Sequence, residues 1–349
     1  MGKLIEKKLP EPSHCVSIGE EYKEPRNDME KRIADIWKKE LNTNKIGVKS
    51  NFFNIGGDSL LAINVSLSIG SGVTISDIYN YPTIEELAKK IQDKKGIDSI
   101  FYSVMEAKDI KGISIVCTPY GGGAPIVYNE LGTQLSKISD KYSLYSIILP
   151  GHDFGEKSDA LKPVGEIAQI CVEEIKKLIK TEIVLYGHCV GSALTIEIAR
   201  LLEKEKIKIK AIFIGGIIPP RFVKYYGNIL DPWKWQSEEV IIKYLNKLGG
   251  ANYAFGNKKM SLIIKAFRHD VRCYMKYFHD FFQNKNSRLI TPVYCIIGES
   301  DSSTKNFEKK YKEWLNYCEK VSLITLKDAN HYFIKSHAHE LANVIDEII

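Results

Sequence analysis

The sequence lacks any pair of cysteines at metal-binding or redox spacing. Its seven cysteines are odd in number, lie far apart and include no C-x-x-C pair. Such a pattern argues against a zinc site and against a disulfide framework. The sequence therefore predicts a cytoplasmic protein with no metal site.

A signal peptide and a long apolar run are also missing. The first residues, MGKLIEKKLPEP, have no apolar core behind their charges, and the longest apolar runs, such as AIFIGGII, have the length of a strand. Neither secretion nor membrane insertion is expected from these features. The net charge is +6, but basic and acidic residues are interleaved, as in EELAKKIQDKK. A nucleic-acid surface needs basic residues gathered on one face, so none is predicted.

The first quarter of the chain has helical periodicity. Residues 1–22 show no periodicity and are predicted to be a linker or disordered. Residues 23–95 are predicted to form a small four-helix domain, because apolar residues recur at helical spacing in NDMEKRIADIWKKEL. Thr83 and Glu86 form a capping box at the start of the last of these helices. Residues 96–108 are predicted to be a second linker.

Residues 109–349 are predicted to form an α/β domain. Six apolar stretches alternate with helical segments, namely ISIVCTP, YSLYSIILP, EIVLYG, IKAIFIGG, TPVYCIIG and VSLITL. This alternation is typical of a mostly parallel sheet with helices on both faces. A long segment rich in aromatic and charged residues, with no strand pattern, separates the fourth and fifth stretches. An insertion of this size predicts a helical lid over about residues 221–289.

The segment LYGHCVGSA, residues 185–193, has the glycine pattern of a nucleophile elbow. A strand runs into a helix there, and Gly187 and Gly191 flank a turn with Cys189 at its tip. Helix N–H groups and a nearby imidazolium favour the thiolate of a cysteine in such a place. Cys189 is therefore the predicted nucleophile, although a buried structural cysteine would fit the same turn. His188, inside the elbow, is expected to pack or to orient a loop.

A cysteine nucleophile needs a base, and the base needs a group that holds its tautomer. His331 follows the last predicted strand, and Asp301 follows the strand before it. The order nucleophile, acid, histidine is that of an α/β-hydrolase. Glu299 and Asp328 compete for the role of the acid, but Glu299 would point elsewhere if the strand persisted and Asp328 lies close to His331 in the sequence. We predict a triad of Cys189, His331 and Asp301.

The segment CTPYGGGAP, after an early predicted strand, is expected to supply half of an oxyanion hole. Its glycines, residues 121–123, let backbone amides approach a ligand, and the backbone N–H groups of Tyr120 and Val190 are the predicted donors. A glycine-rich loop can also hold phosphate. Because no G-x-G-x-x-G or G-K-[ST] pattern accompanies this loop, a nucleotide site is not predicted.

Residues 110–349 resemble the thioesterase domain that ends many nonribosomal peptide and polyketide synthetases. The resemblance lies in CTPYGGG, ILPGHDFGE, LYGHCVGSALTIEIA, GESD and NHYFI, in that order. Residues 25–95 resemble a peptidyl carrier domain, with FFNIGGDSLLAI followed by YPTIEELA. The resemblance implies that Ser59, next to Asp58, carries covalent 4′-phosphopantetheine. It also implies upstream condensation and adenylation domains and a phosphopantetheinyl transferase as partners, and an acyl or peptidyl thioester as substrate.

Two positions depart from this family. Cys189 stands where most relatives have serine. Gly216 stands where terminal thioesterases have their acid, whereas Asp301 matches the pattern of stand-alone editing thioesterases.

The resemblance implies a terminal thioesterase of a nonribosomal peptide or hybrid assembly line. Transfer from the carrier to Cys189 would keep an activated thioester, which favours release by an amine or a hydroxyl as an amide, lactam or lactone. Hydrolytic release and editing hydrolysis are alternatives within the same chemistry. A catalytically degenerate module that only docks carriers is another alternative. A free-standing esterase of dienelactone-hydrolase type would explain the site but not the GGDSL motif.

Overall fold

The chain folds into two compact units, Met1–Gly96 and Ile97–Ile349. The predicted N-terminal linker lies outside the described residues up to residue 21. The computed structural model describes residues 22–69, 73–93, 99–109, 112–152, 161–220, 233–249, 258–283 and 287–349.

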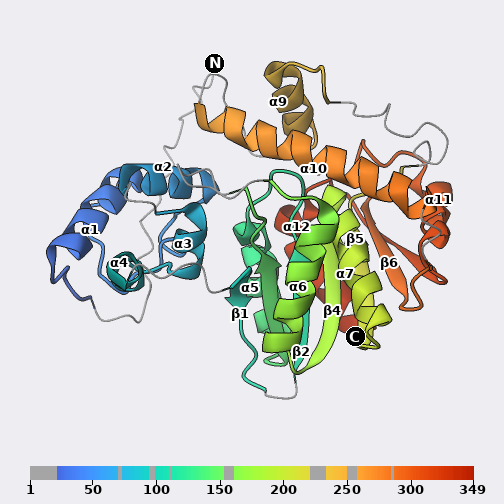
Figure 1. Ribbon diagram of the computed structural model, residues 1–349, viewed down its shortest axis with the longest axis horizontal. Helices are drawn as coiled ribbons and strands as arrows, with labels where there is room; N and C mark the ends of the chain where they lie inside the picture. The colour runs from blue at the N-terminus through green and yellow to red at the C-terminus, as the bar shows by residue number, and fades with distance from the viewer. Residues whose placement is uncertain are drawn as a thin grey trace, which may run out of the picture. The chain divides into compact units, whose positions relative to one another are not determined.

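The described residues of the first unit form four helices, coloured blue to cyan in Figure 1. They are α1 (Asp28–Glu40), α2 (Ser59–Ile69), α3 (Ile75–Asn80) and α4 (Ile84–Asp93). Their apolar faces meet around Trp37 and Phe52, which are both fully buried and whose ring centroids lie 4.8 Å apart. Aromatic rings of this size supply much of the apolar area that so small a domain can bury. The predicted small four-helix domain is confirmed.

Side-chain caps fix where these helices begin, as α4 and α2 show. Thr83 and Glu86 form the predicted capping box of α4: the Glu86 backbone N–H donates to Thr83 Oγ1 and the Thr83 N–H donates to Glu86 Oε2, both at 3.3 Å. Asp58 caps α2, because its Oδ1 accepts a 2.8 Å hydrogen bond from the backbone N–H of Leu61. A local hydrogen bond therefore makes Ser59 the first residue of α2.

The second unit is built on a seven-stranded sheet with the order β1-β3-β2-β4-β5-β6-β7. Strands β2 to β7 run parallel, and they are the six strands that the sequence predicts. The predicted α/β sheet is confirmed. The strands are β1 (Phe101–Met105), β2 (Ile113–Thr118), β3 (Tyr142–Ile147), β4 (Glu182–His188), β5 (Ile209–Gly215), β6 (Val293–Gly298) and β7 (Val321–Leu326).

One predicted boundary is wrong. Residues 96–108, predicted to be a linker, contain β1, which extends the edge of the sheet by pairing antiparallel with β3. Its register runs from Phe101 opposite Ile147 to Met105 opposite Leu144. Only its first two residues are buried, so the segment has no alternation of buried and exposed positions along its length. A five-residue edge strand is then specified by its partner strand more than by its own sequence.

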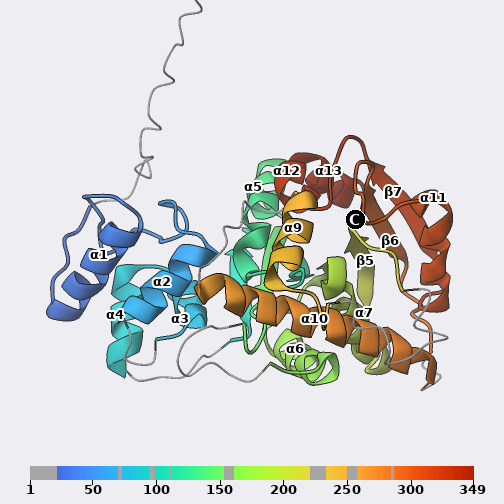
Figure 2. The same cartoon turned by 90° about the horizontal axis from the view of Figure 1, so that it is seen from above.

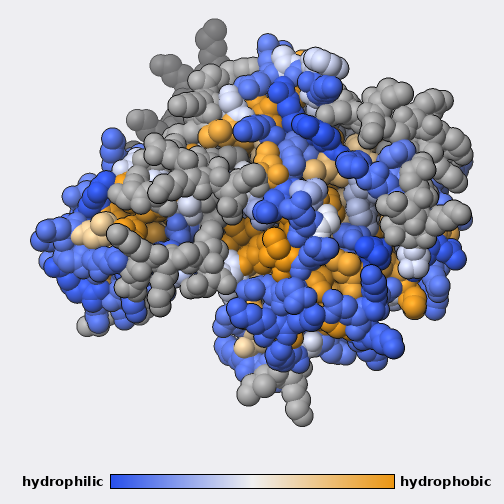
Figure 3. Space-filling view, in the orientation of Figure 1, coloured by the Kyte–Doolittle hydropathy of each residue, from blue (hydrophilic) through white to orange (hydrophobic). Residues whose placement is uncertain are grey.

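Helices cover both faces of the sheet, as predicted (Figures 1 and 2). On one face α6 (Val164–Leu178) packs beside α7 (Ser192–Lys204), and on the other α5 (Asn129–Ile138) packs beside α13 (Ala338–Ile348). One buried apolar cluster joins the first pair to the sheet and a second joins the other pair. Hydrophilic side chains make up most of the described surface in Figure 3, as expected of helices that bury one face.

The described parts of the predicted lid are helical. The helices α9 (Glu238–Lys247) and α10 (Lys258–Gln283) lie across the carboxyl-terminal edge of the sheet, above the turn that follows β4 (Figure 1). This edge is where α/β folds place their sites. Although α10 has 26 residues, no helix in the described part of the chain is long and apolar enough to cross a bilayer. Short elements complete the unit: η1 (Pro125–Tyr128), η2 (Cys189–Gly191), α11 (Phe307–Lys310), η4 (Tyr311–Asn316) and α12 (Phe333–Ser336).

Candidate active site

Cys189 lies at the tip of a sharp turn between β4 and α7. The strand ends at His188, the short helix η2 follows, and α7 begins at Ser192. Cys189 has a φ of 53°, in the left-handed region that residues other than glycine seldom adopt. Such strain persists only where the surrounding structure enforces it, and it is concentrated at functional sites. The local backbone is that of a nucleophile elbow.

Two glycines make this turn possible. A Cβ on Gly187 would overlap the side chain of Thr195 in α7, and a Cβ on Gly191 would overlap the carbonyl oxygen of Pro119. The first glycine lets the strand approach the helix, and the second lets the loop after β2 approach the elbow. The reactive turn therefore lies directly against the loop that is predicted to complete an oxyanion hole.

His331 faces the elbow from the loop between β7 and α12. It is only 3% exposed, its Nδ1 lies 2.8 Å from Oδ2 of Asp301, and it lines the same cavity as Cys189. Asp301 follows β6 and is also buried. Because a carboxylate only accepts, Nδ1 carries a proton toward Asp301 and leaves the other ring nitrogen for the sulfur. The structure joins His331 to Asp301 by a hydrogen bond and places Cys189 and His331 on the wall of one cavity.

The charges of His331 and Asp301 stabilise each other. Burial lowers the pKa of His331, but negative charge on Cys189 and the hydrogen bond with Asp301 raise that pKa to about 10. Burial also raises the pKa of Asp301, but hydrogen bonds with His331 and Ser303 hold it below its usual value. Both shifts favour the charged form of the group. His331 and Asp301 therefore favour an imidazolium paired with a carboxylate.

Glu299 and Asp328, the two alternatives to Asp301 as the acid, belong to the turn after β7 instead. Glu299 Oε2 accepts a 3.1 Å hydrogen bond from the backbone N–H of Asp328. Asp328 itself has a φ of 55° in that turn. Among the described residues, Asp301 is the carboxylate that hydrogen-bonds the ring of His331.

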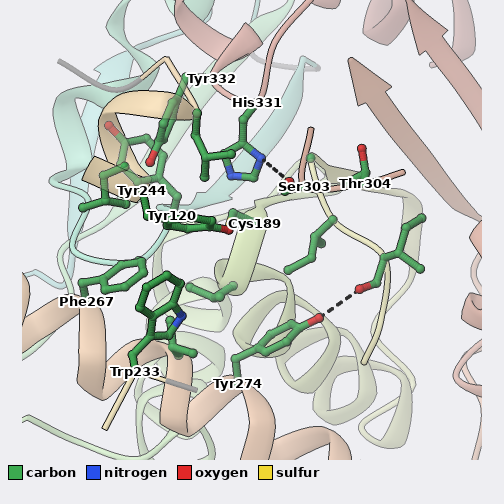
Figure 4. Close-up of a pocket in the computed structure, with 18 of the residues that line it drawn as sticks. Tyr120, Cys189, Trp233, Tyr244, Phe267, Tyr274, Ser303, Thr304, His331 and Tyr332 are labelled. Carbon is green, nitrogen blue, oxygen red and sulfur yellow. Dashed lines mark hydrogen bonds between the residues drawn. The ribbon is translucent and has the colours of Figure 1, made fainter. Parts of the chain in front are cut away.

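Ser303 also belongs to the site, although no predicted motif contained it. Its backbone N–H and its Oγ donate to Asp301 Oδ1 at 2.8 and 2.6 Å, and its Oγ lies 3.2 Å from His331 Nδ1 (Figure 4). An aspartate often accepts from the backbone two residues later. The run DSS, residues 301–303, is the sequence signal for this arrangement.

Tyr120 and Val190 come from the two segments that meet at the elbow. Val190 belongs to η2, Tyr120 lies in the loop after β2, and both line the same cavity as Cys189. The Tyr120 ring is buried edge-on against Tyr332, with ring centroids 4.8 Å apart, so packing holds this loop in place. Backbone N–H groups from these two places stabilise an oxyanion in α/β-hydrolases.

A cavity of about 250 Å³ lies between the elbow and the lid. In Figure 4, His331 lies on one side of Cys189, and Trp233, Phe267 and Tyr274 lie on the other. None of the described residues that line the cavity is an Asp, Glu, Lys or Arg. Aromatic and aliphatic walls of this kind suit an uncharged acyl group and limit the entry of water.

The carrier unit places Ser59 at the start of a helix. Ser59 is the first residue of α2, and Asp58, which caps that helix, is exposed. The N–H groups at a helix N-terminus favour a negatively charged phosphate. These residues fit a phosphate-linked group at Ser59, which would supply a flexible arm that ends in a thiol.

Comparison with known proteins divides the chain into two families. Residues 31–91 match the phosphopantetheine attachment site family, and residues 114–349 match the thioesterase domain family. The first match indicates that the carrier domain bears covalent 4′-phosphopantetheine.

The curated relatives are much longer than this chain. A mycosubtilin synthase subunit of Bacillus subtilis is 31% identical over 208 residues, which cover 58% of this chain and 8% of that protein. Gramicidin S synthase 1 of Brevibacillus brevis is 39% identical over 97 residues, which cover 27% of this chain and 9% of that protein. The chain thus spans less than a tenth of the length of either relative.

Solved structures share the fold. The type II thioesterase BorB from the borrelidin biosynthetic cluster has a TM-score of 0.58 and 18% identity, over 73% of this chain and 99% of that chain. A four-domain nonribosomal peptide synthetase bound to AMP and glycine has a TM-score of 0.52 and 19% identity, over 98% of this chain and 28% of that chain. Together with the match over residues 114–349, these findings show that the chain belongs to the thioesterase family, as an α/β-hydrolase thioesterase domain preceded by a phosphopantetheine carrier domain.

Proposed function

We propose that this chain is the carrier and release module of a nonribosomal peptide or hybrid assembly line, and that its thioesterase domain uses Cys189 as the nucleophile. The observation that carries this proposal is the buried pair of Asp301 and His331 on the cavity that also contains Cys189, whose backbone is strained at the elbow. Two of its relatives are named mycosubtilin synthase and gramicidin S synthase, which supports the assembly-line setting.

In this setting a phosphopantetheinyl transferase modifies Ser59. The attached group supplies a thiol that holds the acyl or peptidyl chain as a thioester, and upstream condensation and adenylation domains provide that chain. A substrate tethered beside its enzyme reaches an effective concentration of roughly millimolar, so the site needs little affinity for it.

In the first step the Cys189 thiolate attacks the carbonyl carbon of the thioester substrate. The backbone N–H groups of Tyr120 and Val190 stabilise the oxyanion that forms. As the tetrahedral species collapses, the bond to the departing sulfur breaks and His331 gives its proton to that sulfur. Asp301 holds His331 in the tautomer that this transfer requires.

In the second step a nucleophile attacks the acyl group on Cys189. The neutral His331 takes the proton of the nucleophile, and the bond to the Cys189 sulfur breaks, which restores the thiolate and the imidazolium. Transfer between sulfurs keeps the acyl chain activated, whereas a serine ester would be less reactive. We therefore favour attack by an amine or a hydroxyl, with amide, lactam or lactone products, in a cavity whose apolar walls limit water.

Editing or releasing hydrolysis is the second candidate function. The position of Asp301 after β6 supports it, because stand-alone editing thioesterases of the resembled family share that pattern. Hydrolysis uses the same acyl-Cys189 intermediate and differs only in the second nucleophile. A degenerate docking module, in contrast, would have no need of the strained elbow or of the buried pair Asp301 and His331.

Intact-protein mass spectrometry tests the proposal. After mixing with an acyl-pantetheine thioester, the protein is expected to gain one acyl group in a burst, and Cys189→Ala is expected to gain none. Cys273→Ala is the matched control, because Cys273 is a half-buried cysteine of α10. Absence of an acyl-protein in the parent, or its persistence in Cys189→Ala, would overturn the nucleophile assignment. Adding amines, alcohols or water alone and identifying the products then separates the two candidate functions.

A further inference from the structure

His188 joins the elbow to the loop that carries His331. It is the last residue of β4, directly before Cys189, and it is fully buried. Its Nε2 lies 2.8 Å from the backbone carbonyl oxygen of His331, which is 143 positions away in the sequence. One hydrogen bond therefore links the neighbour of the nucleophile to the backbone of the base.

The partners of His188 fix the position of its proton. A carbonyl oxygen only accepts, so Nε2 carries the hydrogen and donates it to His331. The other ring nitrogen, Nδ1, lies 3.2 Å from the hydroxyl group of Tyr186, which donates to it. Burial and the nearby charge of His331 lower the pKa of His188 to about 3, so its ring is neutral near pH 7. With both ring nitrogens engaged, His188 is a hydrogen-bond donor and not a proton carrier.

Packing holds the His188 ring in this position. Phe333 meets the ring edge-on with centroids 4.9 Å apart, and the His331 ring lies at 5.5 Å in a similar geometry. Gly216, with a φ of 68°, lies beside the ring, and a Cβ there would come within 3.0 Å of His188 Nε2. The bare glycine at position 216 leaves the room that the donor needs.

We propose, on the basis of the function proposed above, that His188 is a positioning residue of this thioesterase, which holds the backbone of His331 so that its imidazole reaches Asp301 and Cys189 together. The hydrogen bond fixes the peptide plane at His331, and that plane sets the direction of the ring. A misplacement of about 1 Å can cost roughly 100-fold in rate. Gly216 belongs to the same arrangement, because a side chain there would displace the donor.

Two substitutions at His188 separate hydrogen bonding from bulk. His188→Leu keeps an apolar side chain but donates no hydrogen bond, whereas His188→Gln places an amide N–H near the position of Nε2. Burst kinetics with an acyl-pantetheine thioester are expected to show acylation of Cys189 slowed about 10- to 100-fold in His188→Leu. In His188→Leu the KM should change much less than the rate of acylation. His188→Gln should recover most of the parental rate of acylation. His339→Leu is the matched control, because His339 is an exposed histidine of α13.

Alkylation of Cys189 by iodoacetamide gives a readout that needs no thioester. It is expected to be slower in His188→Leu and close to the parental rate in His188→Gln, because the pairing of the sulfur with His331 depends on the position of the ring. Gly216→Ala leaves His188 intact but crowds its ring at 3.0 Å and touches the His331 ring at 3.4 Å, and it is expected to slow both reactions. Thermal melting shows whether each variant is folded.

Parental rates in a folded His188→Leu variant would overturn the proposal. A folded His188→Gln variant as slow as His188→Leu would also overturn it, since the hydrogen bond would then not be the cause. If His188→Leu does not fold, Gly216→Ala becomes the test. Parental rates of acylation and alkylation in a folded Gly216→Ala variant would then overturn the proposal. A parent protein that never forms acyl-Cys189 would instead refute the proposed function, whatever the alkylation rates show about His188.

Discussion

The carboxylate of Asp270, on the lid helix α10, accepts a 2.8 Å hydrogen bond from the backbone N–H of Gly122 in the loop after β2. The same oxygen, Oδ2, lies 2.8 Å from Nε2 of His152, in the loop after β3. Nδ1 of His152 faces the carbonyl oxygen of Pro150 at 3.4 Å. Both ring nitrogens of His152 therefore face acceptors, which favours its imidazolium form. One carboxylate thus ties the lid to two loops at the rim of the site.

Asp270→Ala is expected to slow acylation of Cys189 about tenfold and to lower the melting temperature. The substitution leaves the Gly122 N–H and the His152 ring without their acceptor, and an unsatisfied buried group costs about 1–3 kcal/mol. Burst kinetics and thermal melting measure the two effects. Asp280→Ala on the same helix is the control, because its carboxylate pairs with the exposed Lys276. If Asp270→Ala acylated Cys189 at the parental rate, the contact between Asp270 and Gly122 would not support the loop after β2 in catalysis.

His188 makes the protein sensitive to acid. Its pKa in the folded state, about 3, lies well below the ordinary 6.5 because the ring is buried beside His331. Between these values the unfolded chain binds a proton that the folded chain does not. The contribution of His188 to stability is therefore complete above about pH 6.5 and declines as the pH falls toward 3, by at most about 1.4 kcal/mol per pH unit.

The variant His188→Gln has no group at this position that takes up a proton when the chain unfolds. It is therefore expected to lose less stability in acid than the parent. Urea unfolding of the parent and the variant at about pH 7 and about pH 4.5 measures the difference. Asp301, whose pKa is also lowered, contributes acid sensitivity to both proteins and cancels in the comparison. An equal loss of unfolding free energy in the two proteins would count against a neutral, buried His188.

Cys189→Ser should shift the products toward free acid. The serine variant would form an ester that is less reactive toward amines than the thioester, so water competes better in the second step. Chromatography of the products from one acyl thioester, with and without an added amine, measures the ratio. The same ratio in Cys189→Ser and in the parent would mean that the sulfur does not direct the release chemistry.

Asp301→Asn is expected to reduce acylation by about 10²- to 10⁴-fold, because the amide cannot hold His331 in the required tautomer. Glu299→Gln is the matched control two residues earlier. Its side chain can still accept from the Asp328 backbone through the amide oxygen, so it should stay within about twofold of the parental rate. A large loss in Glu299→Gln together with normal rates in Asp301→Asn would reverse the assignment of the acid.

Ser59→Ala should abolish loading of the carrier domain. Incubation with a phosphopantetheinyl transferase and coenzyme A is expected to add the mass of one phosphopantetheine group to the parent and nothing to the variant. Ser50→Ala serves as control, because Ser50 lies in the loop before α2 and its Oγ accepts from the Gly47 backbone N–H. Modification of Ser59→Ala would place the attachment site elsewhere in the chain.

Several elements could be predicted because their cause is local. The capping box of Thr83 and Glu86 involves residues three positions apart, and the elbow around Cys189 needs glycines two positions away on either side. The strand β1 escaped prediction, since its place beside β3 depends on pairing with a segment forty residues away and not on its own pattern. Ser303 could be predicted only in part. Its hydrogen bond to Asp301 is local, but its place in the site depends on His331, which comes from another loop.

The sequence by itself determined the helices of the carrier domain, the parallel strands and the cysteine elbow, because periodicity, helix caps and close-approach glycines act over a few residues. The order of the motifs predicted Asp301 as the partner of His331, but only the tertiary structure brought the two within 2.8 Å and placed Asp270 against Gly122, 148 positions away. These contacts depend on how the strands align at the carboxyl edge of the sheet and on where the lid helix lies. The strength of a hydrogen bond changes when its donor and acceptor shift by a few tenths of an ångström. Positions are fixed to that precision by the packing of the whole domain and not by any local sequence pattern.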